Sequence, residues 1–256
     1  MMKKLILTLI LAVTPLTAMA AGSGFPLQQA PVDPFDTESL KRGAKAFSDY
    51  CMGCHSAFYM RYNRIAEDLG EDEAWLRDTL IFTRNAEDKP TKVGELMHIA
   101  MTDEYALEVF GTKVPDLTLT ARAKGADWVY TYLKSFYVDP YKATGMNNTV
   151  FPDVSMPNVL WPLQGVQEAV YKTESRQAGD ETIEVDVFDK FEIVRPGKMS
   201  AEEFDAFTGD LVNFMVYIAE PVQADRRSLG WKVLLFLVVF TVLAYLTKKE
   251  YWKDVH

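Results

Sequence analysis

The sequence predicts a mainly α-helical protein with a small inserted β flap and one carboxy-terminal transmembrane helix. Apolar side chains recur at helical spacing in several segments, strict alternation of apolar and acidic residues is confined to one stretch, and a long apolar run stands near the carboxyl end. With 48% hydrophobic and 25% charged residues, the composition is that of a globular rather than a disordered protein. The formal charge of −9 argues against nucleic acid as a partner.

The first twenty residues have the features of a secretory signal peptide. Two lysines precede an apolar stretch from Leu5 to Val13, and Ala18-Met19-Ala20 supplies the small residues of a cleavage site. An uncleaved anchor is the alternative, which the short run and Pro15 disfavour. We therefore expect residues 1–20 to be removed and the chain that follows to be exported.

Helical patterns follow along the exported chain. The first helix is predicted to begin at a cap near Asp36 or Thr37, and its apolar residues reach Cys51 at steps of three and four. The last soluble helix has the capping-box pattern of Ser200 and Glu203 and ends before Pro221. Between them, helices are predicted at Trp75–Leu80, from Thr102 to the residue before Gly111, and at Trp128–Phe136.

The run Cys51-Met52-Gly53-Cys54-His55 is the pattern of covalent haem attachment. Cys51 and Cys54 would form the thioether bonds of a c-type haem, and the imidazole of His55 would be an axial ligand of the iron. The chain has only 2 Cys and 3 His, so a zinc site would need scattered partners without ligand spacing. A redox-active dithiol is the other alternative, but that motif should follow a strand rather than a helix. We therefore predict one covalently bound haem c.

Two stretches between the helices are not helical in pattern. Asp139–Gly165 contains four prolines, too many for a helix interior, so we expect a loop, and long loops in compact domains are usually functional. In Val166–Val194, three β-branched residues alternate with acidic ones, which predicts a hairpin that turns near Ala178-Gly179. We interpret this hairpin as an inserted flap.

An iron that shuttles electrons needs a second axial ligand. Met156 is our candidate, because it stands in the proline-rich loop and the following Pro157 restricts its backbone. The same loop also contains Met146. The remaining alternatives are Met97, His98, Met101 or no sixth protein ligand, and His98 is expected to be a partly buried, hydrogen-bonded histidine.

The stretch Leu229–Leu246 carries a single charge, that of Lys232, and is predicted to cross the membrane. At 1.5 Å per residue it would span ~27 Å of a hydrocarbon core of ~30 Å. A buried core helix is the alternative. Because the flanking charges balance, the signal peptide decides the orientation. The predicted organisation is a signal peptide at 1–20, a periplasmic haem domain at 21–226, a transmembrane helix at 227–247 in the inner membrane, and a cytoplasmic tail at 248–256.

Several motifs follow one another along the chain. They are Arg42-Gly43, Cys51-Met52-Gly53-Cys54-His55-Ser56, Val114-Pro115-Asp116-Leu117, Arg122, Ser155-Met156-Pro157, Ala219-Glu220-Pro221, and Arg226-Arg227 before a single anchor. In this combination and order they resemble the cytochrome c1 family, the haem subunits of bacterial cytochrome bc1 complexes. The resemblance covers most of the exported chain.

The resemblance implies the mainly helical cytochrome c fold, in which the first and last soluble helices cross beside the haem. It also implies Met156 as the sixth ligand, Arg122 at a haem propionate, and Pro115 and Leu117 packed against the haem. A solvated surface charge remains the alternative for Arg122, although a guanidinium suits a half-buried carboxylate.

The function implied is electron transfer from a Rieske iron-sulfur protein to a soluble cytochrome c, within a respiratory quinol–cytochrome c oxidoreductase that also contains cytochrome b. By this interpretation the chain is an electron-transfer subunit with no catalytic residues of its own. The alternatives are an independent membrane-anchored electron carrier, an oxidase subunit, and a periplasmic thiol-disulfide oxidoreductase.

Acidic residues cluster in two places, and they could form a surface that steers a basic acceptor. A solvated face without such a role is the alternative. The clustered acids are Glu67, Asp68, Glu71, Asp72, Glu73, Asp103, Glu104 and Glu108.

Overall fold

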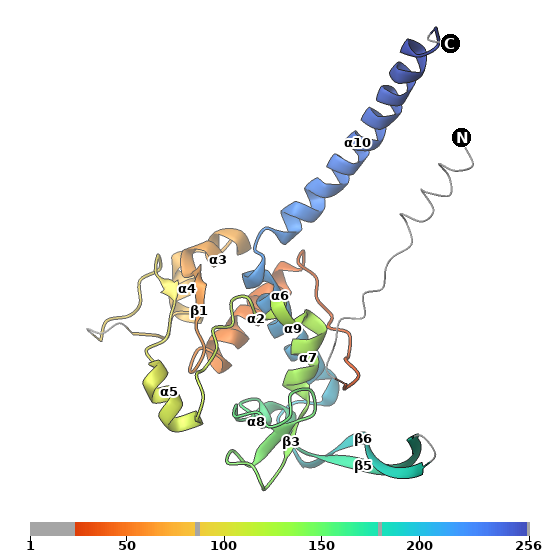
Figure 1. The fold of residues 1–256 in the computed structure, drawn as a ribbon. Coiled ribbons are helices and arrows are strands. Elements are labelled where there is room, and N and C mark those ends of the chain that lie inside the picture. The colour runs from red at the N-terminus through yellow and green to blue at the C-terminus, as the bar shows by residue number, and fades with distance from the viewer. Residues whose placement is uncertain (1–23, 85–87, 179–180, 255–256) are drawn as a thin grey trace.

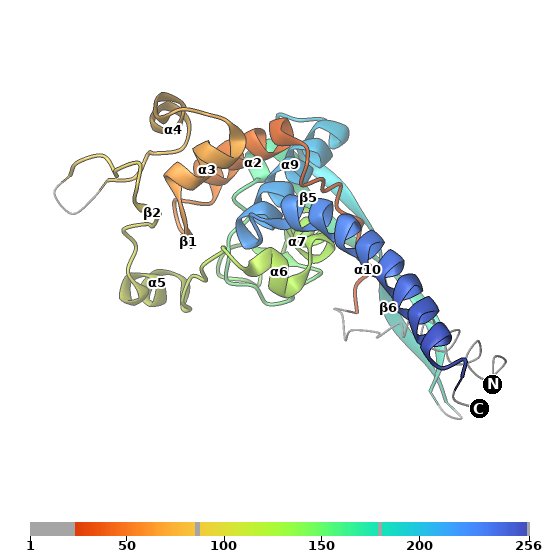
Figure 2. The ribbon, with the colours of Figure 1, turned by 90° about the horizontal axis from the view of Figure 1, so that it is seen from above.

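The computed structural model describes residues 24–84, 88–178 and 181–254, so the predicted signal peptide lies outside the described residues. Figures 1 and 2 show a helical body from which two elements extend. One is the long carboxy-terminal helix α10 (Gln223–Tyr251), and the other is a hairpin of β5 (Gly165–Ala178) and β6 (Glu181–Pro196).

The body is built from short helices around one long pair, which confirms the mainly α prediction. Figure 1 shows α3, α4 and α5 to the left of the α2–α9 pair, and α6 and α7 contact α9. The helices of the body are α2 (Thr37–Tyr50), α3 (Tyr62–Leu69), α4 (Glu73–Thr79), α5 (Asp103–Phe110), α6 (Thr120–Lys124), α7 (Ala126–Lys134), α8 (Trp161–Gln164) and α9 (Ala201–Ala219).

Three antiparallel strand pairs complete the described part. β1 (Ala57–Arg61) pairs with β2 (Leu96–Met97), and β3 (Phe136–Val138) pairs with β4 (Met146–Asn148). In the third pair, β5 and β6 run from the partners Gly165 and Pro196 out to Ala178 and Glu181. This antiparallel pairing confirms the predicted hairpin, while Gly179 of the predicted turn lies outside the described residues.

The capping residues begin the helices where the sequence predicts. The Asp36 carboxylate accepts from Ser39 N at 2.9 Å at the start of α2. At the start of α9, Ser200 and Glu203 form both bonds of a capping box. The Thr102 hydroxyl caps α5, which ends at the left-handed Gly111. These local hydrogen bonds satisfy amide groups that the helices leave unpaired.

The structure corrects two of the predicted segments. α7 ends at Lys134, and Phe136, which the helical period included, begins β3. The segment Asp139–Gly165 is not wholly loop, since it contains β4 and α8. Pro162 lies in the first turn of α8, where a missing amide hydrogen is tolerated.

The sequence analysis also missed two helices, α3 and α6. In α3, four buried residues lie at the spacing of a helical stripe, so the signal was present in the sequence although the helix is short. These residues are Tyr62, Ile65, Ala66 and Leu69. α6 spans only five residues, which is too few for a period to be visible.

The helices α2 and α9 cross in close contact at Gly43. A Cβ atom built on Gly43 would overlap the carbonyl group of Asp210 and lie 2.8 Å from Phe214 Cβ. Beside this contact, Arg42 donates to both carboxylate oxygens of Asp210 at 2.6 and 3.0 Å. One turn further on, the rings of Phe47 and Phe214 pack with centroids 5.5 Å apart. The crossing therefore depends on the missing side chain at Gly43.

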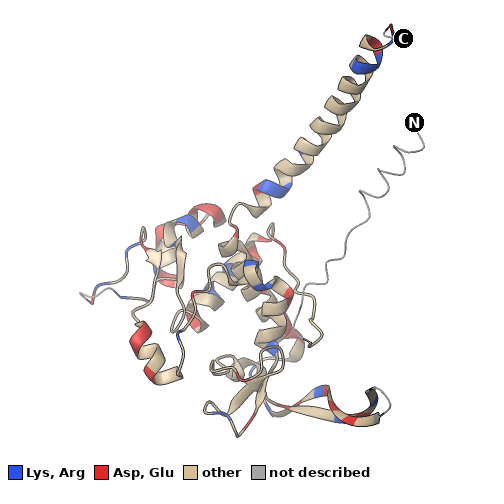
Figure 3. Ribbon diagram, in the orientation of Figure 1, with Lys and Arg blue, Asp and Glu red and all other residues tan. Residues whose placement is uncertain are grey.

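α10 is longer than the predicted span, and the described residues contain this one helix that is long and apolar enough to cross a membrane. None of its most apolar window is buried inside the protein. Figure 3 shows basic residues near both ends of α10 and an uncharged middle. The hydroxyl of Thr241 donates to the Leu237 carbonyl at 2.7 Å, so this polar group is satisfied within the helix. The helix is therefore suited to a single membrane crossing.

Replacing Gly43 by Ala tests the helix crossing. We expect Gly43→Ala to lower the free energy of unfolding by about 1 to 3 kcal/mol, because the added methyl group forces α2 and α9 apart. The measurement is thermal unfolding of the purified full-length holoprotein in detergent. Gly94→Ala is the matched control, since a Cβ at Gly94 meets nothing within 4 Å. Stabilisation by Gly43→Ala, as the higher helix propensity of alanine alone would give, would contradict the close crossing.

Candidate haem-binding site

The C-x-x-C-H run forms a tight turn that continues directly from α2. Cys51 N donates to the Phe47 carbonyl at 2.9 Å, and His55 N donates to the Cys51 carbonyl at 2.9 Å. Both cysteines are free and partly buried. The end of one helix thus places two thiols and an imidazole within a single turn, as attachment of a porphyrin to Cys51 and Cys54 requires.

The imidazole of His55 is held in one orientation. Its Nδ1 lies 2.7 Å from the Pro115 carbonyl oxygen, which has no hydrogen to give, so Nδ1 carries the proton and donates. Burial lowers the pKa of His55, which keeps the ring neutral, although the Pro115 hydrogen bond opposes this shift. Nε2 has no hydrogen-bond partner among the described residues and is left with a lone pair that can bind a metal.

The surroundings of Cys51 disfavour a dithiol enzyme. Burial raises the pKa of the Cys51 thiol to about 12, and the neighbouring Cys54 adds to the shift. A dithiol oxidoreductase instead lowers the pKa of its attacking cysteine so that the thiolate forms near neutral pH. The motif also follows a helix rather than a strand.

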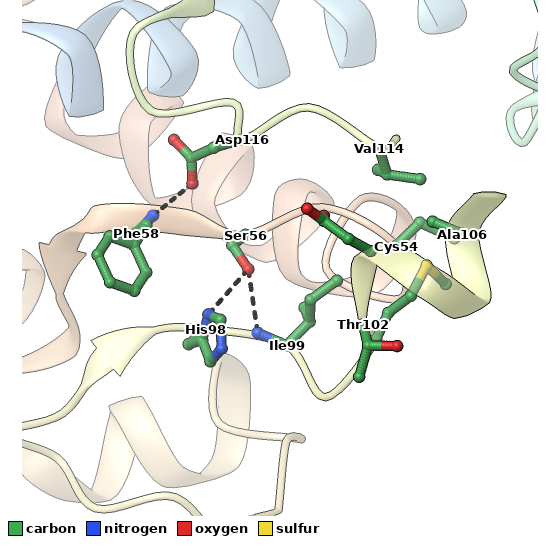
Figure 4. A pocket seen from close by; sticks show the side chains of 11 residues that line it. Cys54, Ser56, Phe58, His98, Ile99, Thr102, Ala106, Val114 and Asp116 are labelled. Atoms are coloured by element: carbon green, nitrogen blue, oxygen red, sulfur yellow. Dashed lines mark hydrogen bonds between the residues drawn. The ribbon is translucent and has the colours of Figure 1, made fainter. Parts of the chain in front are cut away.

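Asp116 fixes the segment that holds His55, a role the sequence analysis did not assign. Its carboxylate accepts from Phe58 N at 2.6 Å, as Figure 4 shows, and from Thr118 N at 2.9 Å. Leu117 N donates to the Ser56 carbonyl at 2.9 Å. These bonds hold the segment against β1, and the carbonyl of Pro115 then reaches His55. The sequence signal was the adjacency of Asp116 to Pro115, but nothing in it indicated this contact.

A pocket beside Cys54 contains two of the alternative ligands, His98 and Met101. Ser56 Oγ lies 3.3 Å from His98 Nδ1 and accepts from Ile99 N at 3.1 Å (Figure 4). The expected hydrogen bond of His98 is therefore confirmed, but the expected partial burial is wrong, because its side chain is exposed at the rim of the pocket. Met97 is fully buried in the core.

Met156 is partly buried, and its sulfur has a specific partner. The hydroxyl of Tyr132, on α7, lies 3.2 Å from Met156 Sδ and donates to it. Burial raises the pKa of Tyr132, so the hydroxyl stays protonated at neutral pH. Met146, the alternative in the same loop, lies in β4 opposite Val138.

Two buried asparagines shape the loop that leads to Met156. Asn148 donates to the Tyr132 carbonyl at 2.8 Å and accepts from the amides of Val150 and Phe151 at 2.9 and 3.1 Å. Asn147 accepts from Asp153 N at 2.9 Å. The loop lacks long regular structure, so these side chains supply hydrogen bonds that a sheet or helix would otherwise provide.

Pro115 and Leu117, the two residues predicted to pack against the haem, differ in exposure. Leu117 is partly buried and packs against the core, whereas the ring of Pro115 is exposed and its carbonyl makes the contact with His55. Packing of these two side chains against a haem stays a prediction.

Arg122 is an exposed side chain that pairs with Glu220. Its Nη1 lies 3.4 Å from Glu220 Oε2, and Glu220 also accepts from Arg226 at 2.6 and 3.1 Å. The propionate contact of Arg122 therefore stays a prediction.

The predicted acidic surface is partly neutralised. Asp68 pairs with Arg64 at 2.6 Å and accepts from the Tyr217 hydroxyl, Glu71 pairs with Lys41, Glu73 with Arg77, and Asp103 with Lys113. Among the described residues, Glu67, Asp72, Glu104 and Glu108 form no ion pair, although Asp72 caps α4 by accepting from Trp75 N. Glu104 and Glu108 lie on α5, where Figure 3 shows acidic residues. Steering of a basic acceptor by these charges stays a prediction.

Taken together, the described residues fit a covalently bound haem. The fit rests on the paired thiols, the neutral imidazole with an unpartnered nitrogen, and the thioether of Met156. In addition, the Nδ2 of Asn158, two residues after Met156, is buried and has no hydrogen-bond partner among the described residues. Burying an N–H donor without an acceptor lowers the stability of the folded protein, unless a polar group of a bound molecule accepts from it.

Comparison with known proteins gives one consistent family. The model of the Cytochrome C1 family matches residues 27–182 and 197–255. The chain is 49% identical over 255 residues to cytochrome c1 of Allochromatium vinosum, with 100% of both chains covered. It is 44% identical to a protein of Nitrosomonas europaea named ammonia monooxygenase gamma subunit, covering 100% of this chain and 99% of that one. Cytochrome c1 of Cereibacter sphaeroides is 26% identical over 298 residues, with 100% and 97% covered.

Replacing Asn148 by Ala tests the hydrogen bonds that shape the Met156 loop. We expect Asn148→Ala to lower the free energy of unfolding by about 2 to 3 kcal/mol, because buried backbone groups lose their partners. The measurement is thermal unfolding of the full-length holoprotein. The exposed Asn63, replaced in the same way, is the control and should change stability by no more than about 0.5 kcal/mol. Equal effects of the two substitutions would refute the role of Asn148.

Proposed function

Because this chain belongs to the cytochrome c1 family, we propose that it passes single electrons from a Rieske iron-sulfur protein to a soluble cytochrome c within a quinol–cytochrome c oxidoreductase. Its cofactor is one covalently bound haem c, which supplies reversible one-electron chemistry when bound. The observation that carries the proposal is the full-length match combined with the C-x-x-C-H turn and its oriented histidine.

The residues of the site have distinct tasks in this proposal. Cys51 and Cys54 would hold the cofactor covalently, and His55, oriented by the Pro115 carbonyl, would ligate the iron through Nε2. Met156 would supply the second ligand, and a thioether ligand favours the reduced state of the iron. No residue moves a proton in this scheme. The chain sets the reduction potential and shapes the surface at which partners approach.

Arg122 is proposed to contact a haem propionate as well as Glu220. A guanidinium has five N–H donors, so one ion pair with Glu220 leaves donors for a second carboxylate. Leu117 and Pro115 are proposed to lie against the porphyrin, since both belong to the segment that holds His55.

We propose that the haem domain, residues 21–226, lies in the periplasm. A chain exported from its amino end and halted by α10 leaves the domain outside, a membrane helix at 227–247, and residues 248–256 in the cytoplasm. The exposed apolar surface of α10 supports contact with lipid and with cytochrome b as the membrane partner.

Copurification tests the proposed complex. Gentle detergent extraction of the tagged full-length protein should yield b-type haem and an iron-sulfur protein together with the chain. Isolation of the chain alone, still carrying its haem, would instead indicate an independent electron carrier.

A second candidate function follows from the Nitrosomonas europaea relative, whose name makes it a subunit of a monooxygenase. The same extraction would then yield other monooxygenase subunits without b-type haem. A preparation with two titratable thiols and no haem after complete maturation would refute both functions and favour a thiol-disulfide oxidoreductase.

Replacing Met156 by Leu tests the axial ligand. We expect Met156→Leu to leave the haem attached but to lower its reduction potential and open the sixth position to carbon monoxide, because leucine cannot ligate iron. The measurements are a redox titration and the absorption change on adding carbon monoxide. Met146→Leu is the control and should leave both unchanged. The reverse result would assign the ligand to Met146.

A further inference from the structure

We propose that Tyr132 is a positioning residue for Met156, whose hydroxyl holds the thioether in place and weakens it as an electron donor to the haem iron. The inference rests on the proposed ligation by Met156. It concerns a side chain on α7 that neither the sequence motifs nor the family resemblance singled out.

The contact is specific in geometry. The Tyr132 hydroxyl lies 3.2 Å from Met156 Sδ, and it makes no other hydrogen bond with the described residues. A tyrosine hydroxyl is both donor and acceptor, whereas a thioether sulfur only accepts, so the proton must point towards the sulfur.

The ring of Tyr132 is fixed on both sides. It stacks on Trp128 with centroids 5.0 Å apart and an interplanar angle of 9°, and it meets Phe136 edge-on with centroids 5.1 Å apart. Side chains held by packing on a rigid element position a ligand more accurately than a loop does by itself. Tyr132 therefore transmits the rigidity of α7 to Met156 in the loop.

The backbone of the same residue is tied to the same loop. Asn148 Nδ2 donates to the Tyr132 carbonyl at 2.8 Å, and its Oδ1 accepts from Val150 and Phe151 in the segment before Met156. The loop thus meets Tyr132 at two points, at the carbonyl through Asn148 and at the hydroxyl through the sulfur. This double contact distinguishes Tyr132 from a tyrosine that merely fills space.

The chemistry follows from the two lone pairs of a thioether. One can bind iron while the other accepts from the hydroxyl, and the hydrogen bond withdraws electron density from the sulfur. Weakening the donor destabilises oxidised iron more than reduced iron, because the oxidised ion gains more from electron donation. The hydroxyl should therefore raise the reduction potential, an effect of hydrogen bonding around the ligand.

Tyr132→Phe removes the hydroxyl and keeps the ring. In redox titrations of the purified membrane complex, we expect a lower midpoint potential, with a change of up to about tenfold in the equilibrium between oxidised and reduced protein, which is 59 mV for one electron. The absorption band that a thioether gives when bound to oxidised haem should shift but persist. Tyr130→Phe is the matched control, since its hydroxyl, on the same helix, has Lys134 Nζ as its partner at 3.2 Å.

Met156→Leu, measured alongside, separates this inference from the proposed function. If Met156→Leu lowers the potential and Tyr132→Phe does not, the ligand stands and the role of Tyr132 is refuted. If neither changes the potential, the assignment of Met156 fails and this inference fails with it. A loss of thermal stability in Tyr132→Phe at an unchanged potential would mean a purely structural role and would also refute the proposal.

Discussion

The contact between α2 and α9 at Gly43 is the constraint on which the rest of the protein depends. Only a residue without a side chain lets the backbone of α2 approach Asp210 so closely. The rings of Phe47 and Phe214 then pack within the core, and the Arg42–Asp210 pair closes the outer side. Since Cys51 directly follows α2, the depth of this crossing determines where the thiols and His55 lie relative to α9.

Both proposed iron ligands are held by groups that lie far from them in sequence. Pro115, 60 residues after His55, orients the imidazole, and Tyr132, 24 residues before Met156, contacts the thioether. Each of these partners is itself fixed, Pro115 through the neighbouring carboxylate of Asp116 and Tyr132 through its stack on Trp128. The proposed ligands are therefore oriented in advance by hydrogen bonds from residues that do not themselves bind iron. In this way a protein tunes an iron centre whose chemistry belongs to the cofactor.

The carboxylate of one glutamate links the haem domain to the membrane helix by hydrogen bonds and ion pairs. Glu220 follows α9 and accepts two hydrogen bonds from Arg226 on α10, while Arg122 approaches it from α6. The cations of Arg226 and Arg122 contribute to lowering the pKa of Glu220, with the Arg226 hydrogen bond as the largest cause, so the group stays charged at neutral pH. Three elements thus meet at one ion-pair cluster, where the anchor leaves the domain.

The sequence by itself determined the features that depend on local chemistry. Capping residues and helical periods predicted α2, α5 and α9, and the alternation of apolar and acidic residues predicted the hairpin. The apolar run predicted α10, and the spacing of two cysteines and a histidine predicted the cofactor. The tertiary structure alone decided which distant groups meet: the carbonyl of Pro115 at His55, the hydroxyl of Tyr132 at Met156, and Glu220 at Arg122. No local pattern encodes these contacts, because a backbone carbonyl or a hydroxyl acquires its partner only when the packing of the helices brings separate segments together.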